Sequence, residues 1–143
     1  MHTFCAFCDR EVDIQEIVRT PLVKVIYPRR PVVESAVMIM PIRHCENIHA
    51  LSSEETADIF AMVAKIQAVF QKIYAAEGYN LFANNGIAAG QHIPHVHFHL
   101  YGRMPHEPVS PFTVLNSKEL SGELRKLSAV EIQERVEKIR AEL

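Results

Sequence analysis

The chain of 143 residues carries 15 basic and 17 acidic side chains, for a net charge of −2, and 48% of its residues are hydrophobic. This size and composition are typical of one globular domain, so we expect residues 1–143 to form a single domain. The near-neutral charge argues against general binding to nucleic acid or to a membrane surface. The sequence has neither the roughly 20 consecutive apolar residues of a membrane span nor the pattern of a signal peptide, so we expect a cytoplasmic protein.

In chain order, the first expected elements are short strands followed by one long helix. Residues 17–20, 22–27 and 34–40 are rich in strand-forming side chains, and prolines close the second and third of these segments. From Ser52 the apolar period becomes helical, with Ser52 and Glu55 in a capping-box pattern and Gly78 as the expected stop. We therefore predict a helix over residues 52–77. Its apolar stripe is expected in the core and consists of Ile59, Met62, Val63, Ile66, Val69, Phe70, Ile73 and Tyr74.

The second half of the chain repeats the change from strand to helix. Residues 79–83 are predicted to form a strand that leads into the turn at 84–86. A further strand is expected to run through a cluster of histidines to about Tyr101, and a second capping box, Ser128 with Glu131, predicts a final helix. The apolar face of that helix is expected to contain Ile132, Val136, Ile139 and Leu143. This order of elements predicts an α+β fold with an antiparallel sheet.

Four of the eight histidines lie between positions 92 and 99, and the last three of these alternate with apolar residues. On a strand, His95, His97 and His99 would share one face while the apolar residues between them face the core. The outer two Cα atoms would then be about 13 Å apart, too far for one metal with bonds of about 2 Å to hold all three imidazoles. The pattern therefore favours divided roles, with one histidine reacting and its neighbours binding or orienting.

The three cysteines form a second candidate site. Cys5 and Cys8 make a Cys-x-x-Cys pair, whereas Cys45 lies alone beside His44. Such a pair in a cytoplasmic chain is a redox centre, half of a metal site, or incidental, and a thioredoxin-like redox pair would need a preceding strand. A metal site needs two more ligands. The candidates are His44, His49, His95 and His106.

Together these residues resemble the histidine triad (HIT) superfamily, whose signature alternates three histidines with apolar residues and is commonly introduced by Gly-Gln, here at 90–91. The segment at 41–47, Pro-Ile-Arg-His-Cys-Glu-Asn, is similar to the family segment that precedes its long helix. Asn84, seven residues before Gln91, stands where family members carry a polar substrate-binding residue. The resemblance covers most of the chain and implies an antiparallel sheet flanked by helices.

The resemblance implies nucleotidyl transfer at an α-phosphate. His97 would attack phosphorus and form a covalent nucleotidyl-histidine, His99 would bind a phosphate oxygen, and Asn84 and Gln91 would help to hold the phosphate. The expected protein is a hydrolase of a nucleoside phosphoramidate or dinucleoside polyphosphate, with a purine nucleotide as substrate. The alternative is a nucleotide-binding regulatory module with little turnover, which would need the same pocket.

The resemblance also bears on the cysteines. Some bacterial family members, and the related galactose-phosphate uridylyltransferases, bind zinc through a Cys-x-x-Cys pair, a histidine before the helix and the first triad histidine. Carried over to this chain, the zinc ligands are Cys5, Cys8, His44 and His95. Two thiolates and two imidazoles form a closed tetrahedral set, which is typical of a structural site. Cys45 would then be a bystander.

Two positions depart from the family pattern. The family usually carries Asp or Asn, which grips the ribose hydroxyls, where this chain has Tyr27-Pro28-Arg29. Arg29 or Arg30 would instead meet a phosphate or an acidic leaving group, or would form a solvated basic turn. His92 stands where Ser or Thr is common, and it is expected either to protonate the leaving group or to be a surface histidine.

Assembly is the last expectation. Small residues flank the apolar stripe of the predicted helix, which permits close contact between helices or simply reflects good helix formers on an exposed face. They are Ala57, Ala61, Ala64 and Ala68. Proteins of the histidine triad superfamily usually pair through the long helix and a neighbouring strand, so the resemblance implies a homodimer.

Overall fold

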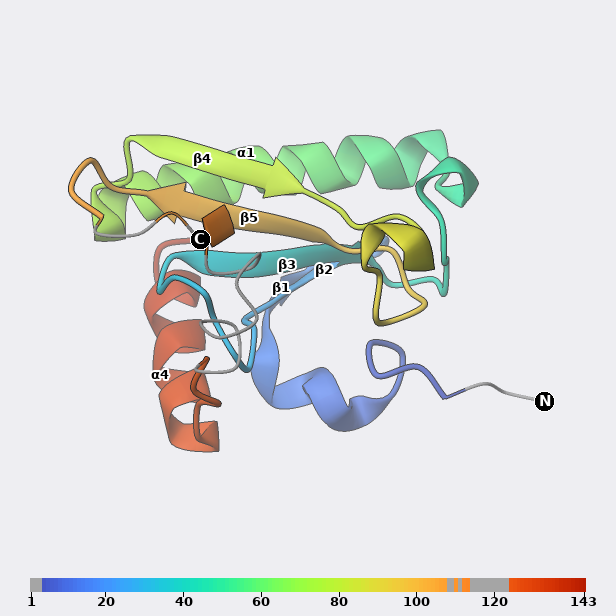
Figure 1. The fold of residues 1–143 in the computed structure, drawn as a ribbon, viewed down its shortest axis with the longest axis horizontal. Coiled ribbons are helices and arrows are strands. Elements are labelled where there is room, and N and C mark those ends of the chain that lie inside the picture. Colours follow the sequence, from blue (N-terminus) through green and yellow to red (C-terminus); the bar gives the residue numbers. More distant parts are fainter. Residues whose placement is uncertain (1–3, 108–109, 111, 114–123) are drawn as a thin grey trace.

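The computed structural model describes residues 4–107, 110, 112–113 and 124–143 (Figure 1). Within these residues, five strands form one antiparallel sheet in the order β1-β2-β3-β5-β4. The strands are β1 (Glu16–Arg19), β2 (Val23–Ile26), β3 (Ala36–Pro41), β4 (Gly78–Phe82) and β5 (Phe98–Arg103). The helices are α1 (Ser53–Tyr74), α4 (Ala129–Arg140) and the short 3-10 helices η1 (Arg10–Gln15), η2 (Ile48–Ala50) and η3 (Ile87–Ala89). The predicted α+β fold with an antiparallel sheet is confirmed.

The two faces of the sheet have different coverings. One face carries Ile39 and Leu100, which lie in the main hydrophobic core together with the buried stripes of α1 and α4. Figure 1 shows α1 lying lengthwise along the sheet, with α4 beside β1. On the opposite face, Phe7 of the amino-terminal segment packs against Met40. Because successive strand residues point to opposite faces, His99 also lies on this second face, away from the helices.

The long helix follows its sequence signals closely at its start. Ser52 Oγ accepts a hydrogen bond from the Glu55 amide at 3.0 Å, and Glu55 Oε2 accepts one from the Ser52 amide at 2.9 Å. Arg43, in the loop after β3, donates through Nε and Nη2 to the same carboxylate at 3.0 and 2.8 Å. The hydrogen bonds from Arg43 lower the pKa of Glu55. This network ties the predicted capping box to the loop that precedes the helix.

The end of α1 differs from the prediction. The helix stops at Tyr74, and Ala75 takes a left-handed conformation with φ +54° as its cap. Gly78, the expected stop, is instead the first residue of β4. The chain reverses direction early because β4 pairs with β5, and the amide of Glu77 already donates to the carbonyl of Arg103 at 2.9 Å.

The histidine strand begins later than its alternating pattern predicts. The strand β5 starts at Phe98, so the first two histidines of the triad lie in the preceding loop. The amide of Val96 donates to the carbonyl of Cys45 at 2.6 Å, and the amide of His95 donates to Ile93 at 2.8 Å. These backbone groups serve contacts within and between loops, so the sheet ladder cannot extend through them.

The C-terminal helix confirms its capping box and most of its predicted face. Ile132, Val136 and Ile139 are buried, with exposed fractions of 2%, 2% and 0%. Leu143 was expected on the same face, but α4 ends at Arg140 and Leu143 is 47% exposed. Among the described residues, no helix is both long and apolar enough to cross a bilayer.

Candidate active site and metal-ligand cluster

Two cysteines and two histidines meet at one end of the sheet. The ligand atoms of Cys5, Cys8, His44 and His95 all lie within 4.8 Å of one another. Cys8 Sγ is 3.3 Å from His44 Nδ1 and 3.4 Å from His95 Nδ1, and Cys5 Sγ is 3.6 Å from the same His95 nitrogen. Tetrahedral zinc with bonds of about 2.0–2.3 Å separates neighbouring ligand atoms by about 3.3–3.8 Å. In this metal-ligand cluster, the three separations of 3.3, 3.4 and 3.6 Å therefore match the spacing of ligand atoms around a tetrahedral ion.

The buried histidine of the cluster presents a defined nitrogen to the two sulfurs. His95 Nε2 lies 2.8 Å from the carbonyl oxygen of Pro41, and a carbonyl can only accept, so Nε2 carries the proton. The Nδ1 lone pair then faces the thiols of Cys5 and Cys8. Burial is the main cause that lowers the pKa of His95 to about 4, which keeps the ring neutral near pH 7. A neutral imidazole held by a carbonyl is the usual form of a histidine metal ligand.

The turn that carries the cysteines, residues 5–8, is fixed from two sides. The amide of Cys5 donates to Asp9 Oδ2 at 3.1 Å. The ammonium of Lys24 on β2, only 6% exposed, donates to the carbonyl of Phe7. The first contact closes the turn locally, and the second ties it to the sheet.

The structure also shows which of the four histidines considered as candidate ligands lie near the two cysteines. The cluster contains His44 and His95, and neither His49 nor His106 belongs to it. The thiol of Cys45 donates to the carbonyl of Asn47 at 3.2 Å and stands outside the cluster. The likeness to zinc-binding family members thus selected the same two histidines that the fold brings together.

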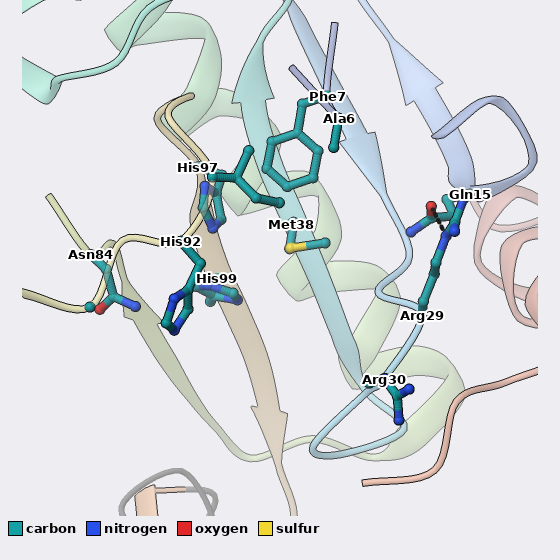
Figure 2. Close-up of a pocket in the computed structure, with 12 residues that line it drawn as sticks. Ala6, Phe7, Gln15, Arg29, Arg30, Met38, Asn84, His92, His97 and His99 are labelled. Carbon is teal, nitrogen blue, oxygen red and sulfur yellow. Dashed lines mark hydrogen bonds between the residues drawn. The ribbon is translucent and has the colours of Figure 1, made fainter. Parts of the chain in front are cut away.

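A cavity of about 490 Å³ opens beside the cluster, on the sheet face opposite the helices. Its volume falls within the range of about 300–1,000 Å³ that is usual for small-molecule sites. Figure 2 shows His97, His99, His92 and Asn84 gathered on one side of this cavity. Its lining consists of Ala6, Phe7, Gln15, Arg29, Arg30, Met38, Asn84, Gly90, His92, Ile93, His97 and His99.

The middle histidine of the triad has one nitrogen committed to the protein. His97 Nδ1 lies 2.8 Å from the carbonyl oxygen of His95, so Nδ1 carries the proton and donates. The ring is neutral, since burial lowers its pKa, and its Nε2 holds the lone pair. His97 lines the cavity, and an unprotonated imidazole nitrogen in such a place has the chemistry of a nucleophile or of a hydrogen-bond acceptor.

The third histidine is held beside the second. The rings of His97 and His99 are 5.0 Å apart and nearly perpendicular. Phe82 of β4 stacks on His99 with ring centres 4.8 Å apart and an angle of 18°. Burial, and then the neighbouring His97, lower the pKa of His99 to about 4. Two neutral imidazoles thus face the same cavity.

Of the other predicted binding residues, Asn84 and His92 line the cavity, whereas Gln91 does not belong to its lining. Gln91 Oε1 accepts from the amide of Gly86 at 2.7 Å, and Gln91 Nε2 donates to the carbonyl of Glu46 at 3.0 Å. The side chain of Gln91 therefore braces the loop that carries Asn84 and His92. Its contact with substrate stays a prediction.

The sequence analysis missed part of the cavity wall, above all Phe7. The Phe7 ring packs edge-on against His97 at 5.0 Å and against His95 at 5.9 Å. Its place between Cys5 and Cys8 could have identified it, because a side chain in a metal-binding turn is fixed near the ligands. Met38 and Ile93 are apolar lining residues that carry no comparable sequence signal.

The fold and the site define a class of protein in which alternating histidines line a cavity on an antiparallel sheet, beside a cysteine and histidine cluster. A sequence profile of the HIT domain matches residues 9–106, and the chain belongs to the HIT family. The resemblance of its histidines to the histidine triad superfamily is confirmed.

Two relatives from Schizosaccharomyces pombe have named activities. The bis(5′-nucleosyl)-tetraphosphatase [asymmetrical] is 33% identical over 92 residues, which cover 64% of this chain and 50% of that protein. The adenosine 5′-monophosphoramidase is 30% identical over 118 residues, covering 76% of this chain and 86% of that protein. This chain therefore spans half the length of the first relative and most of the second. Both names describe enzymes that hydrolyse nucleotides, which agrees with the expectation that this protein is an enzyme.

Solved structures agree on the fold. A Zn-bound histidine triad family protein from Mycobacterium smegmatis superposes with a TM-score of 0.74 at 22% identity, covering 96% of this chain and 91% of that one. The NitFhit protein of Caenorhabditis elegans gives a TM-score of 0.75 at 24% identity, covering 91% of this chain and 27% of that one.

Proposed function

We propose that this protein hydrolyses a purine nucleotide at its α-phosphate, with a nucleoside phosphoramidate or a dinucleoside polyphosphate as substrate. The observation that carries the proposal is the hydrogen bond from His97 Nδ1 to the carbonyl of His95 at 2.8 Å. This bond leaves the Nε2 lone pair for a phosphorus atom in the cavity. The names of the two yeast relatives support the substrate class.

The reaction has two balanced steps. In the first, a bond forms between His97 Nε2 and the α-phosphorus while the bond from phosphorus to the leaving amine or phosphate breaks. The leaving group takes up a proton, for which His92 in the cavity wall is our candidate donor. In the second step water attacks the phosphorus and gives up a proton, which returns to His92, while the bond from phosphorus to His97 Nε2 breaks and a nucleoside monophosphate leaves.

The remaining groups hold the phosphate. His99 and Asn84 line the same side of the cavity as His97 and supply donors to the phosphate oxygens (Figure 2). Gln91 braces the loop between Asn84 and His92, and we assign it to positioning this loop and through it the substrate.

The test is incubation with adenosine 5′-phosphoramidate and with diadenosine tetraphosphate, followed by chromatography for AMP. Acid-quenched protein is digested and examined by mass spectrometry for an AMP adduct on His97. His97→Ala is the test variant, and His49→Ala, which changes an exposed histidine outside the cavity, is the matched control. We expect AMP release and the adduct in wild type and in the control, and neither in His97→Ala.

Two results would contradict the proposal. Tight nucleotide binding with no AMP release from either substrate favours the regulatory module, the alternative that uses the same pocket. AMP release that survives in His97→Ala excludes His97 as the nucleophile.

We further propose that the metal-ligand cluster holds a structural zinc ion. Two thiolates and two imidazoles suit zinc, and with all four positions taken by the protein no site remains for substrate. When bound, the ion would fix residues 5–8 to the loop before β5, and no step of the reaction passes through it. Thiolate ligands must stay reduced, so a cytoplasmic location belongs to the same proposal. Metal analysis of the purified protein should give close to one zinc per chain.

We also propose a homodimer. The strand β4 lies at the edge of the sheet that the described residues form, and Leu81 on it is 37% exposed. On the neighbouring helix α1, Phe60 is 52% exposed and lies 6.3 Å from Phe98. An open strand edge beside exposed apolar side chains suits a partner strand and helix. Light scattering should give twice the chain mass of 16.3 kDa, and a mass near one chain at micromolar concentration excludes the dimer.

A further inference from the structure

The wall of the cavity opposite the histidines is basic. Arg29 and Arg30 follow β2 and line the cavity, and Figure 2 shows both on the far side of Met38 from His97 and His99. The described lining residues of this cavity include no carboxylate. A nucleotide whose α-phosphate lies at His97 therefore has guanidinium groups within the same cavity.

A second cavity continues this basic wall. Its volume is about 460 Å³, and it shares Arg29, Arg30, Met38 and His99 with the first. Lys126 adds a third positive side chain to the lining, again with no carboxylate among the described lining residues. The two cavities are therefore neighbours that share the arginines as a common wall, with Lys126 in the lining of the second.

The first arginine is held by a buried partner. Arg29 Nε donates to Gln15 Oε1 at 2.8 Å, and Gln15, only 3% exposed, donates through Nε2 to the carbonyl of Tyr27 at 2.8 Å. This chain of bonds fixes the guanidinium at the cavity. A guanidinium has five N–H donors in a rigid fork, so it can serve other protein groups and still meet an anion.

These contacts favour an anion over a ribose diol at this place. An acceptor oxygen such as a carboxylate is the usual partner of a pair of hydroxyl donors, and the lining has no carboxylate among its described residues. Here the Gln15 oxygen accepts from Arg29, and Arg30 donates through Nη1 to the carbonyl of Leu124 at 2.9 Å. The groups presented are donors with positive charge, which suit a tetrahedral phosphate.

We propose that Arg29 and Arg30 form a subsite for a second phosphate, so that the substrate carries a phosphate group in addition to the α-phosphate attacked by His97. The second phosphate is attached either to the ribose or to the 5′-phosphate chain. The inference rests on the proposed function only for the location of the α-phosphate. It makes the substrate a nucleotide with at least two phosphate groups.

The test is titration calorimetry with three ligands that need no turnover: AMP, adenosine 3′,5′-bisphosphate and α,β-methylene-ADP. We expect either adenosine 3′,5′-bisphosphate or α,β-methylene-ADP, the two ligands with a second phosphate group, to bind at least about tenfold more tightly than AMP. Such a gain corresponds to one charge-assisted contact. A preference for the first assigns the second phosphate to the ribose. A preference for the second assigns it to the 5′-phosphate chain.

The variants Arg29→Gln and Arg30→Gln should remove this tenfold advantage while changing AMP affinity less than about twofold. Arg29→Lys keeps the charge without the fork and should retain part of it. Arg19→Gln, the same charge change outside both cavities, is the matched control. Melting curves of each variant report whether it is folded.

Three results overturn the subsite. Neither ligand with a second phosphate binds more tightly than AMP, the arginine variants lower the affinity for AMP as much as the affinity for these ligands, or no nucleotide binds. The first two leave the proposed hydrolysis intact if AMP is still released from a substrate. Conversely, if a ligand with a second phosphate binds more tightly than AMP but the hydrolysis test releases no AMP, only the proposed hydrolysis is contradicted.

Discussion

His95 and His97 lie two residues apart and present opposite nitrogens. His95 donates from Nε2 to Pro41 and turns Nδ1 toward the sulfurs of Cys5 and Cys8, whereas His97 donates from Nδ1 to His95 and keeps Nε2 for the cavity. The carbonyl that each ring meets decides its tautomer, and the tautomer decides its use. A repeated residue type in a regular pattern can thus serve two regions with different chemistry.

This comparison predicts that activity at His97 and metal binding at His95 can be lost separately. The largest expected effect is on turnover. His97→Ala should lower kcat/KM by roughly a thousandfold or more, since no other group would replace the covalent nucleophile that we propose. The same variant should keep its bound metal and most of its melting temperature. Steady-state kinetics, metal analysis and calorimetry on one sample check this. If metal is lost as well, the two regions are not separable.

A variant in the metal-ligand cluster should instead lose metal and stability. Cys8→Ser should lose the bound metal and lower the free energy of unfolding by about 3 kcal/mol, or roughly 10 °C in melting temperature. A chelator should do the same to wild type. Cys45→Ser changes a buried thiol outside the cluster and should keep its metal. Metal-free protein that melts no earlier than wild type would remove the case for a structural ion.

The pH dependence of stability separates the regions more finely. The pKa of His99 is lowered to about 4, against 6.5 for an ordinary histidine, mainly by burial. Between pH 4 and pH 6.5 the unfolded chain therefore binds a proton at His99 that the folded chain does not bind. The resulting contribution to stability is fully present above pH 6.5 and declines as the pH falls toward 4. One such group contributes roughly 2 kcal/mol between pH 7 and pH 5. Urea unfolding of His99→Gln should show a pH dependence smaller by about that amount, and identical slopes in both proteins would contradict the shift.

The smallest expected effect is at Phe7, where the two regions touch. Phe7→Leu keeps apolar volume but removes the edge-on ring contacts with His95 and His97, each of which contributes about 0.5–1.5 kcal/mol. We expect kcat to fall about threefold to tenfold with metal retained. Unchanged kcat would mean that the wall formed by residues 5–8 does not position the nucleophile.

The parts of the fold that sequence predicted well depend on local contacts. The Ser52–Glu55 and Ser128–Glu131 boxes join residues three apart, so a short window contains the whole signal. The end of α1 depended on Glu77 bonding to Arg103, a contact with a distant strand that periodicity cannot contain. That is why Gly78 was wrong as the helix stop.

The site divides in the same way. The alternation of histidines correctly grouped His97 and His99 at one cavity, because both lie at or beside a regular strand. It could not indicate that Val96 bonds to Cys45 and keeps His95 out of that strand. Gln15 had no signal at all, since its importance comes from the arginine that it meets after folding.

The metal-ligand cluster also has a consequence for the order of folding. Its contacts join residues 36, 87 and 90 positions apart along the chain, so loops of this length must close before the four side chains can meet. Such contacts form late, after the sheet has brought the segments together. We therefore expect an ion held there to leave the refolding rate nearly unchanged and to slow unfolding, so that its stabilisation lengthens the lifetime of the folded protein.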